Sequence, residues 1–146
     1  MLGKIGQILL IIAACCIFSI INFGSYTKGG IPSLNQAIAS IVFLFLLLIY
    51  GFWMGRKKDV FFLKFSSIYW GIGLFLIILS YSTSAESIGI PAVILYAGPV
   101  YGINYFLKFP TDSGLVFLSI IISYVIGLAG FSIGRLLKKS IHHHIL

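Results

Sequence analysis

Long stretches of the chain carry no charged side chain, and this feature restricts the possible fold more than any other. Five such stretches, mostly apolar, occupy residues 5–27, 29–55, 65–85, 87–107 and 113–134. A helix that crosses the hydrocarbon core of a bilayer needs about 20 predominantly apolar residues. Each stretch is long enough, so the sequence predicts an all-α integral membrane protein.

The overall composition points the same way. Hydrophobic residues make up 60% of the chain and charged residues 9%, whereas a soluble domain contains roughly a quarter charged residues. The composition does not shift along the chain as it would between two folding units, so we predict a single transmembrane domain over residues 1–146. The formal charge of +7 sits at the ends of apolar runs, which favours contact with the lipid bilayer over nucleic-acid binding.

We predict that the chain forms a four-transmembrane-helix bundle. The spans are expected at about 5–23, 34–54, 62–81 and 113–137. With four spans, all basic residues except Lys28 and Lys108 fall on one side, which the positive-inside rule identifies as cytoplasmic. The predicted cytoplasmic basic anchors include Arg56, Lys57, Lys58, Lys64, Arg135, Lys138 and Lys139. We therefore expect a multi-pass protein of a cell membrane with both termini in the cytoplasm, and the residue usage is typical of an AT-rich bacterial genome.

Helix boundaries can be placed from short signals between these spans. The glycines and serine from Gly24 to Gly30 predict a turn after the first helix. Ser33 with Gln36 three residues later forms a capping-box pattern at the start of the second helix. Pro110, Thr111 and Asp112 are typical residues for the start of the last helix.

Residues 88–109 form an additional apolar segment that is long enough to be a fifth span. Charge argues against a crossing, because five spans would move the basic cluster near residue 138 to the outer side. We therefore expect a broken helical segment that lies at the outer face or is re-entrant. Gly98 and Pro99 are the candidate helix break or re-entrant turn, and Tyr101, Tyr105 and Phe109 are expected on one interfacial face.

The last span carries a stripe of small residues at helical spacing. A stripe of this kind lets two helix backbones approach closely, which drives helix association in lipid. The partner is either another helix of this chain, a second subunit or another membrane protein. Gly51 and Gly55 form a shorter pattern of the same kind on the second helix. The candidate helix-packing face consists of Ser119, Ser123, Gly127, Gly130 and Gly134.

Groups that could support catalysis are missing from the predicted spans. The acidic residues Asp59, Glu86 and Asp112 all lie at predicted ends or loops, so no span carries a carboxylate for proton coupling or acid–base chemistry. We predict no enzyme activity, no catalytic residues, no cofactor and no metal site. The histidines at 142–144 follow the last span, where they lack a fixed geometry for a metal.

Cys15 and Cys16 allow more than one interpretation. The string Ile12, Ala13, Ala14, Cys15 resembles the cleavage box of bacterial lipoproteins, which implies lipidation of Cys15. The chain stays apolar through Phe23, unlike the polar start of a mature lipoprotein. We therefore expect two small buried side chains.

These features favour a small membrane protein that acts through helix contacts as an accessory, regulatory or immunity-type component. Its expected partners are the lipid bilayer, further copies of itself or another membrane protein. The alternative is an oligomeric pore, a holin-like protein or a small-solute transporter, in which the break near Gly98 and the side chain of Asn104 would line the path.

Overall fold

The computed structural model describes residues 3–109 and 113–143, and within these ranges the chain is helical without any strand. The predicted all-α fold is therefore confirmed for this part of the chain. The elements are α1 (Lys4–Thr27), α2 (Leu34–Lys57), α3 (Val60–Thr83), α4 (Glu86–Ala92), the π-helical turn η1 (Val93–Ala97), the 3-10 helix η2 (Gly98–Ile103), α5 (Asn104–Leu107) and α6 (Ser113–His143).

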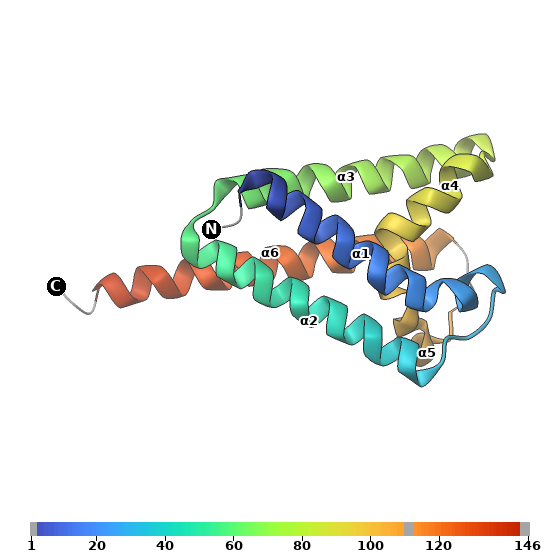
Figure 1. Cartoon of the computed structure of the whole chain (residues 1–146), viewed down its shortest axis with the longest axis horizontal. Helices are drawn as coiled ribbons and strands as arrows, with labels where there is room; N and C mark the ends of the chain where they lie inside the picture. Colours follow the sequence, from blue (N-terminus) through green and yellow to red (C-terminus); the bar gives the residue numbers. More distant parts are fainter. Residues whose placement is uncertain (1–2, 110–112, 144–146) are drawn as a thin grey trace.

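Four long helices form the bundle and alternate in direction (Figure 1). α1 and α3 run one way, and α2 and α6 run the other way. α2 and α6 lie side by side and parallel, because Gly51 meets Gly127 and Gly55 meets Phe131 further along both helices. The first turn of α1 and the last turns of α6 consequently lie towards the same end of the molecule (Figure 1). We refer to this as the basic end and to the opposite one as the connection end.

Within the part of the chain that the structure describes, five helical stretches are long and apolar enough to cross a membrane by length and composition. Four of them are the long helices, and the fifth combines α4 to α5 over Glu86–Leu107. The outward-facing surface agrees with an apolar environment, since large hydrophobic side chains such as Ile5, Ile20 and Phe75 are well exposed. In water such a surface would be unfavourable, whereas lipid tails solvate it.

Helix boundaries differ from the sequence predictions at several ends. Gly24 and Ser25 belong to α1, so the predicted turn begins too early and the connection is confined to residues after Thr27. The capping box at the start of α2 is confirmed: the Gln36 backbone N–H donates to Ser33 Oγ, and the Ser33 N–H donates to Gln36 Oε1 at 2.8 Å. The expected helix-start residues 110–112 lie outside the described residues.

The fifth stretch does not run straight across the bundle. Its start packs on the end of α3, where Ser80 Oγ donates to Ala85 O at 3.1 Å. It then reaches the middle of α3, where Tyr69 donates its hydroxyl to Leu95 O at 3.0 Å. It finally returns, because Tyr101 donates to Gly30 O in the connection between α1 and α2 at 2.9 Å. The segment enters from the connection end and leaves at the same end, as Figure 1 also shows.

Two prolines and a change of helix type explain this reversal. Pro91 and Pro99 lack the N–H that would continue an α-helix. After Pro91 the winding loosens to π-helix in η1 and then tightens to 3-10 helix in η2, which contains Pro99, and this change turns the chain back within a few residues. The helical hydrogen bonds are weakened at this point, so neighbouring helices must supply donors.

Candidate functional site

The small-residue face of α6 lies against α2. A Cβ atom added to Gly130 would meet the carbonyl of Leu48, and one added to Gly134 would meet the carbonyl of Phe52. Gly51 and Gly55 contribute from the α2 side, where added Cβ atoms would meet the carbonyls of Gly127 and Phe131. The helix backbones therefore touch with no room for any side chain, which is the close approach that glycine allows in membrane helices.

The two serines of this face form hydrogen bonds within α6. Ser119 and Ser123 are buried, and each donates its hydroxyl to the carbonyl four residues earlier in α6, at 2.8 and 2.9 Å. Gly127 faces the side chain of Leu47 at ordinary contact distance. Of the five residues of the predicted face, the three glycines thus pack against α2, and the two serines bond to the backbone of their own helix.

A buried polar cluster holds the re-entrant turn. Asn22 of α1 is fully buried and donates its Nδ2 to the carbonyls of Gly98 at 2.8 Å and Pro99 at 3.2 Å. Ser40 of α2 donates to Pro99 O at 2.8 Å and accepts from the N–H of Gly102 at 3.0 Å. Asn22 Nδ2 also lies 3.1 Å from Ser40 Oγ. Side chains from two helices thereby satisfy the backbone groups that the break leaves open.

Further donors extend this support around the turn. Ser19 of α1 donates to Ile94 O, and Tyr69 of α3 donates to Leu95 O. The close fit continues at Gly98 and Gly102, where an added Cβ would press on Ser19 and on the Gln36 carbonyl respectively. Gly98 and Pro99, the candidate break, are therefore enclosed by α1 and α2 and do not face the surface.

The aromatic and amide side chains of the returning half lie differently from the sequence expectation. Tyr101 is buried and bonded to Gly30 O, so the expected interfacial face shared with Tyr105 and Phe109 is wrong for this residue. Asn104 is buried as well, and it closes the segment through two hydrogen bonds with the backbone of Phe109, at 2.9 and 3.0 Å. Its side chain is occupied in ending the helix and does not line a path.

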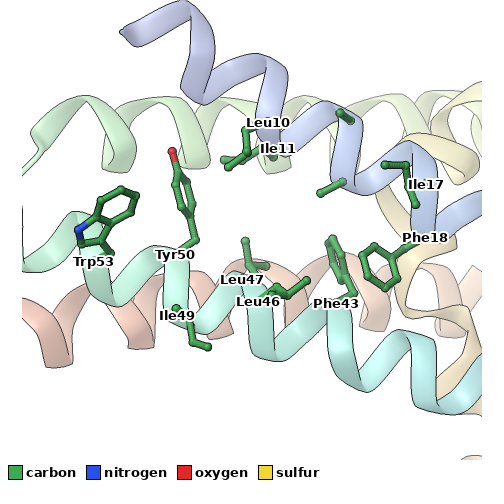
Figure 2. A pocket seen from close by; sticks show the side chains of 12 residues that line it. Leu10, Ile11, Ile17, Phe18, Phe43, Leu46, Leu47, Ile49, Tyr50 and Trp53 are labelled. Atoms are coloured by element: carbon green, nitrogen blue, oxygen red, sulfur yellow. The ribbon is translucent and has the colours of Figure 1, made fainter. Parts of the chain in front are cut away.

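An apolar groove separates α1 from α2 near the middle of the bundle (Figure 2). Its volume is about 470 Å³, within the range of ~300–1,000 Å³ typical of small-molecule pockets. Phe18 and Phe43 close one end with ring centroids 5.5 Å apart, and Trp53 stands at the other (Figure 2). The lining residues are Leu10, Ile11, Ala13, Ala14, Ile17, Phe18, Phe43, Leu46, Leu47, Ile49, Tyr50 and Trp53.

Beyond the two ends of the groove, hydrogen bonds hold α1 to α2 at the connection end and to the connection between α2 and α3 at the basic end. At the connection end Ser25 donates to Gln36 Oε1 at 2.7 Å, beside the contact of Asn22 with Ser40. At the basic end Gln7 donates its Nε2 to Asp59 Oδ2 at 2.8 Å. Between these fixed points the small side chains of α1 leave the groove open.

Basic residues gather next to the Trp53 end of the groove. Lys57 places its Nζ 3.7 Å from the centroid of the Trp53 ring, within cation–π range. Arg56 and Lys58 flank it and are exposed. The remaining predicted anchors Lys64, Arg135 and Lys138 are exposed on α3 and α6, towards the same end of the bundle, and only the helical backbone is described for Lys139.

The cysteines and histidines form no site among the described side chains. Cys15 is buried and Cys16 is half-buried, and neither is in a disulfide, so the expectation of two buried side chains is accurate for Cys15 alone. No three His, Cys, Asp or Glu residues of the described part come close enough to hold a metal ion. His144 lies outside the described residues, and for His142 and His143 only the helical backbone is described.

Sequence reasoning missed Asn22, Ser40 and Tyr69, although they hold the turn. Each is a single polar residue inside an apolar stretch. The available signal was the cost of placing an amide in hydrocarbon, which makes a polar residue inside a span a candidate for a buried contact. Comparison of the chain with protein-family models, curated proteins and solved structures finds no match.

Proposed function

We propose that this protein is a four-span, non-enzymatic membrane protein that acts through contacts within the bilayer as an accessory, regulatory or immunity-type component. In this proposal α1, α2, α3 and α6 cross the membrane of a bacterial cell. The segment from α4 to α5 enters from the outer side and returns to it. Both termini lie in the cytoplasm.

Helix directions and charge together support this topology. Lys4, Arg56, Lys64 and Arg135 belong to the ends of the four long helices that meet at the basic end. Lys28 follows α1 and Lys108 follows α5 at the connection end. The positive-inside rule assigns the side richer in Lys and Arg to the cytoplasm.

The observation that carries the proposed role is the way in which the interior polar groups are used. Asn22, Ser40 and Tyr69 all donate to the backbone of the re-entrant segment. Ser119 and Ser123 bond to their own helix. These groups stabilise the fold and do not converge on one point where a reaction could take place. We therefore propose that the protein acts on other components through its contact surfaces.

Crosslinking in intact membranes tests this role. Photoreactive residues placed at exposed positions on the outer faces, such as Ile20 on α1 and Phe75 on α3, are expected to form a discrete adduct with one partner. A matched probe at Gly3, exposed beyond the start of α1, controls for random collision. Adducts that stay absent at every outer position, together with purification of the protein alone in mild detergents, would overturn the proposal.

One feature favours the second candidate, an oligomeric pore or small-solute transporter. Re-entrant helical segments with irregular backbone line permeation paths in several transporter folds. The reversal at η1 and η2 is such a segment. Flux of ions or dyes across liposomes decides between the two roles: protein-dependent flux that rises steeply with protein density would replace the accessory role with the pore.

A further inference from the structure

We propose that the groove between α1 and α2 is a binding site for one anionic phospholipid, with an acyl chain in the groove and the headgroup beside Lys57. This inference concerns a ligand of the bundle and does not depend on the accessory role. It combines the shape of the groove, its apolar wall and the position of positive charge at one end.

The shape fits an extended hydrocarbon chain. From Phe43 to Trp53 the groove follows α2 for about 15 Å at the helical rise. Its wall consists of aliphatic and aromatic side chains, with Ala13 and Ala14 providing the space on the α1 side. A straight alkyl chain fills such a space without bringing in a polar group that would itself need a hydrogen-bond partner.

The two ends of the groove differ, and this difference sets the orientation of the bound lipid. Phe18 and Phe43 meet at the end towards the re-entrant turn, deep in the bundle, where the methyl end of an acyl chain would stop. Trp53 stands at the other end, and indole rings favour the headgroup level of a bilayer. The lipid is therefore expected to lie with its headgroup at the basic end.

Charge then selects the type of headgroup. The Lys57 ammonium is held over the Trp53 ring at 3.7 Å, which places a positive charge beside the groove opening. Arg56 and Lys58 are exposed on either side in sequence. Basic residues near the membrane surface each attract anionic lipid by about fivefold in binding, so a phosphatidylglycerol headgroup is preferred over a zwitterionic one.

A lipid explains these features better than a protein segment does. The groove is narrow at its Phe18 end and basic only at its other end, as an amphiphile with one charged terminus requires. An inserted helix would need about 10 Å of free width along its whole length, whereas α1 is held to α2 beyond one end of the groove and to the connection between α2 and α3 beyond the other.

The test uses the full-length protein, delipidated in detergent and titrated with palmitoyl-oleoyl phosphatidylglycerol or the phosphatidylcholine of the same chains, with native mass spectrometry as readout. One tightly retained phosphatidylglycerol is expected, bound about fivefold or more tightly than phosphatidylcholine. Ala14→Trp fills the groove and should abolish this binding, whereas Gly71→Trp, where an added Cβ meets nothing within 4 Å, should not.

Lys57→Gln keeps the experiment decisive if Ala14→Trp fails to fold. It should lower the preference for phosphatidylglycerol about fivefold, while Lys64→Gln, an exposed position on α3, should leave it unchanged. Equal binding of the two lipids, or full retention in Ala14→Trp, would overturn the site. A photoreactive residue at Ala13 that labels a protein and not a lipid would overturn it as well.

Discussion

Asn22 on α1 reaches across to Gly98 in the re-entrant turn, and its Nδ2 donates to the glycine carbonyl at 2.8 Å. The same amide group lies 3.2 Å from the carbonyl of Pro99. One fully buried side chain thus donates to two consecutive backbone carbonyls of the turn. A position 76 residues earlier in the chain therefore decides whether the turn can form.

Replacing this amide should weaken the fold strongly. Asn22→Leu is of similar size but removes the amide donor to Gly98 O, whereas Pro99 O keeps the hydroxyl of Ser40, and the loss of such a buried hydrogen bond costs roughly 1–3 kcal/mol. The free energy of unfolding, measured by denaturant titration in micelles, should fall by about 2 kcal/mol or more. Asn35→Leu changes an exposed asparagine of α2 and should have little effect; an equal loss in both variants would contradict the assigned role.

The two buried tyrosine hydroxyls should respond in opposite ways to removal. Tyr69 donates to Leu95 O at 3.0 Å, so Tyr69→Phe should destabilise the protein by about 1 kcal/mol or more. The Tyr50 hydroxyl is buried without a hydrogen-bond partner among the described residues, and Tyr50→Phe should leave the stability unchanged or raise it. Thermal unfolding of the two variants side by side measures the difference, and a larger loss in Tyr50→Phe would refute this interpretation.

Glycine substitutions should distinguish the contact between α2 and α6 from the outward-facing surface of the bundle. In Gly134→Ala the new methyl group would meet the Phe52 carbonyl, and overpacking of this kind costs about 1–3 kcal/mol. In Gly71→Ala the methyl group meets nothing within 4 Å, and the higher helix propensity of alanine should add about 0.5–1 kcal/mol. Unfolding in micelles measures whether each variant loses or gains stability. A stabilised Gly134→Ala would show that α2 and α6 do not touch as described.

The path of the re-entrant segment can be tested by labelling intact cells with an impermeant thiol reagent. In a background without Cys15 and Cys16, single cysteines at Ser84 and Lys108 should both react from outside, because both positions end the segment at the connection end. A cysteine at Lys58 should react only after the cells are opened. Labelling of only one of the pair at 84 and 108 would mean that residues 86–107 cross the membrane.

Much of the helical framework was predictable from charge-free runs and from capping residues. The start of α2 follows from Ser33 and Gln36, and the loss of regular helix near Gly98 and Pro99 follows from their backbone properties. Local sequence determines both features. The end of α1 was misplaced, because Gly24 and Ser25 are turn formers whose preference is overridden when the helix continues to Thr27.

The contacts that hold the turn could not be derived from spacing. Asn22 and Ser40 lie on different helices, and their meeting depends on how α1 and α2 pack around η2. Tyr101 was expected at an interface because tyrosine favours that level, yet the tertiary fold turns it towards Gly30. The groove was not predicted either, because nothing in the sequence distinguishes Ala13 and Ala14 from other apolar residues of a helix.

The dependence of the turn on earlier helices also links its formation to residues that come before it in the chain. The donors Ser19, Asn22, Ser40 and Tyr69 all precede the segment that needs them. During synthesis in the proposed arrangement, residues 86–107 emerge as a stretch apolar enough to be inserted as a crossing helix. In that arrangement the backbone of the segment returns only where α1, α2 and α3 supply these donors, so the orientation of α6 depends on side chains that are synthesised before it.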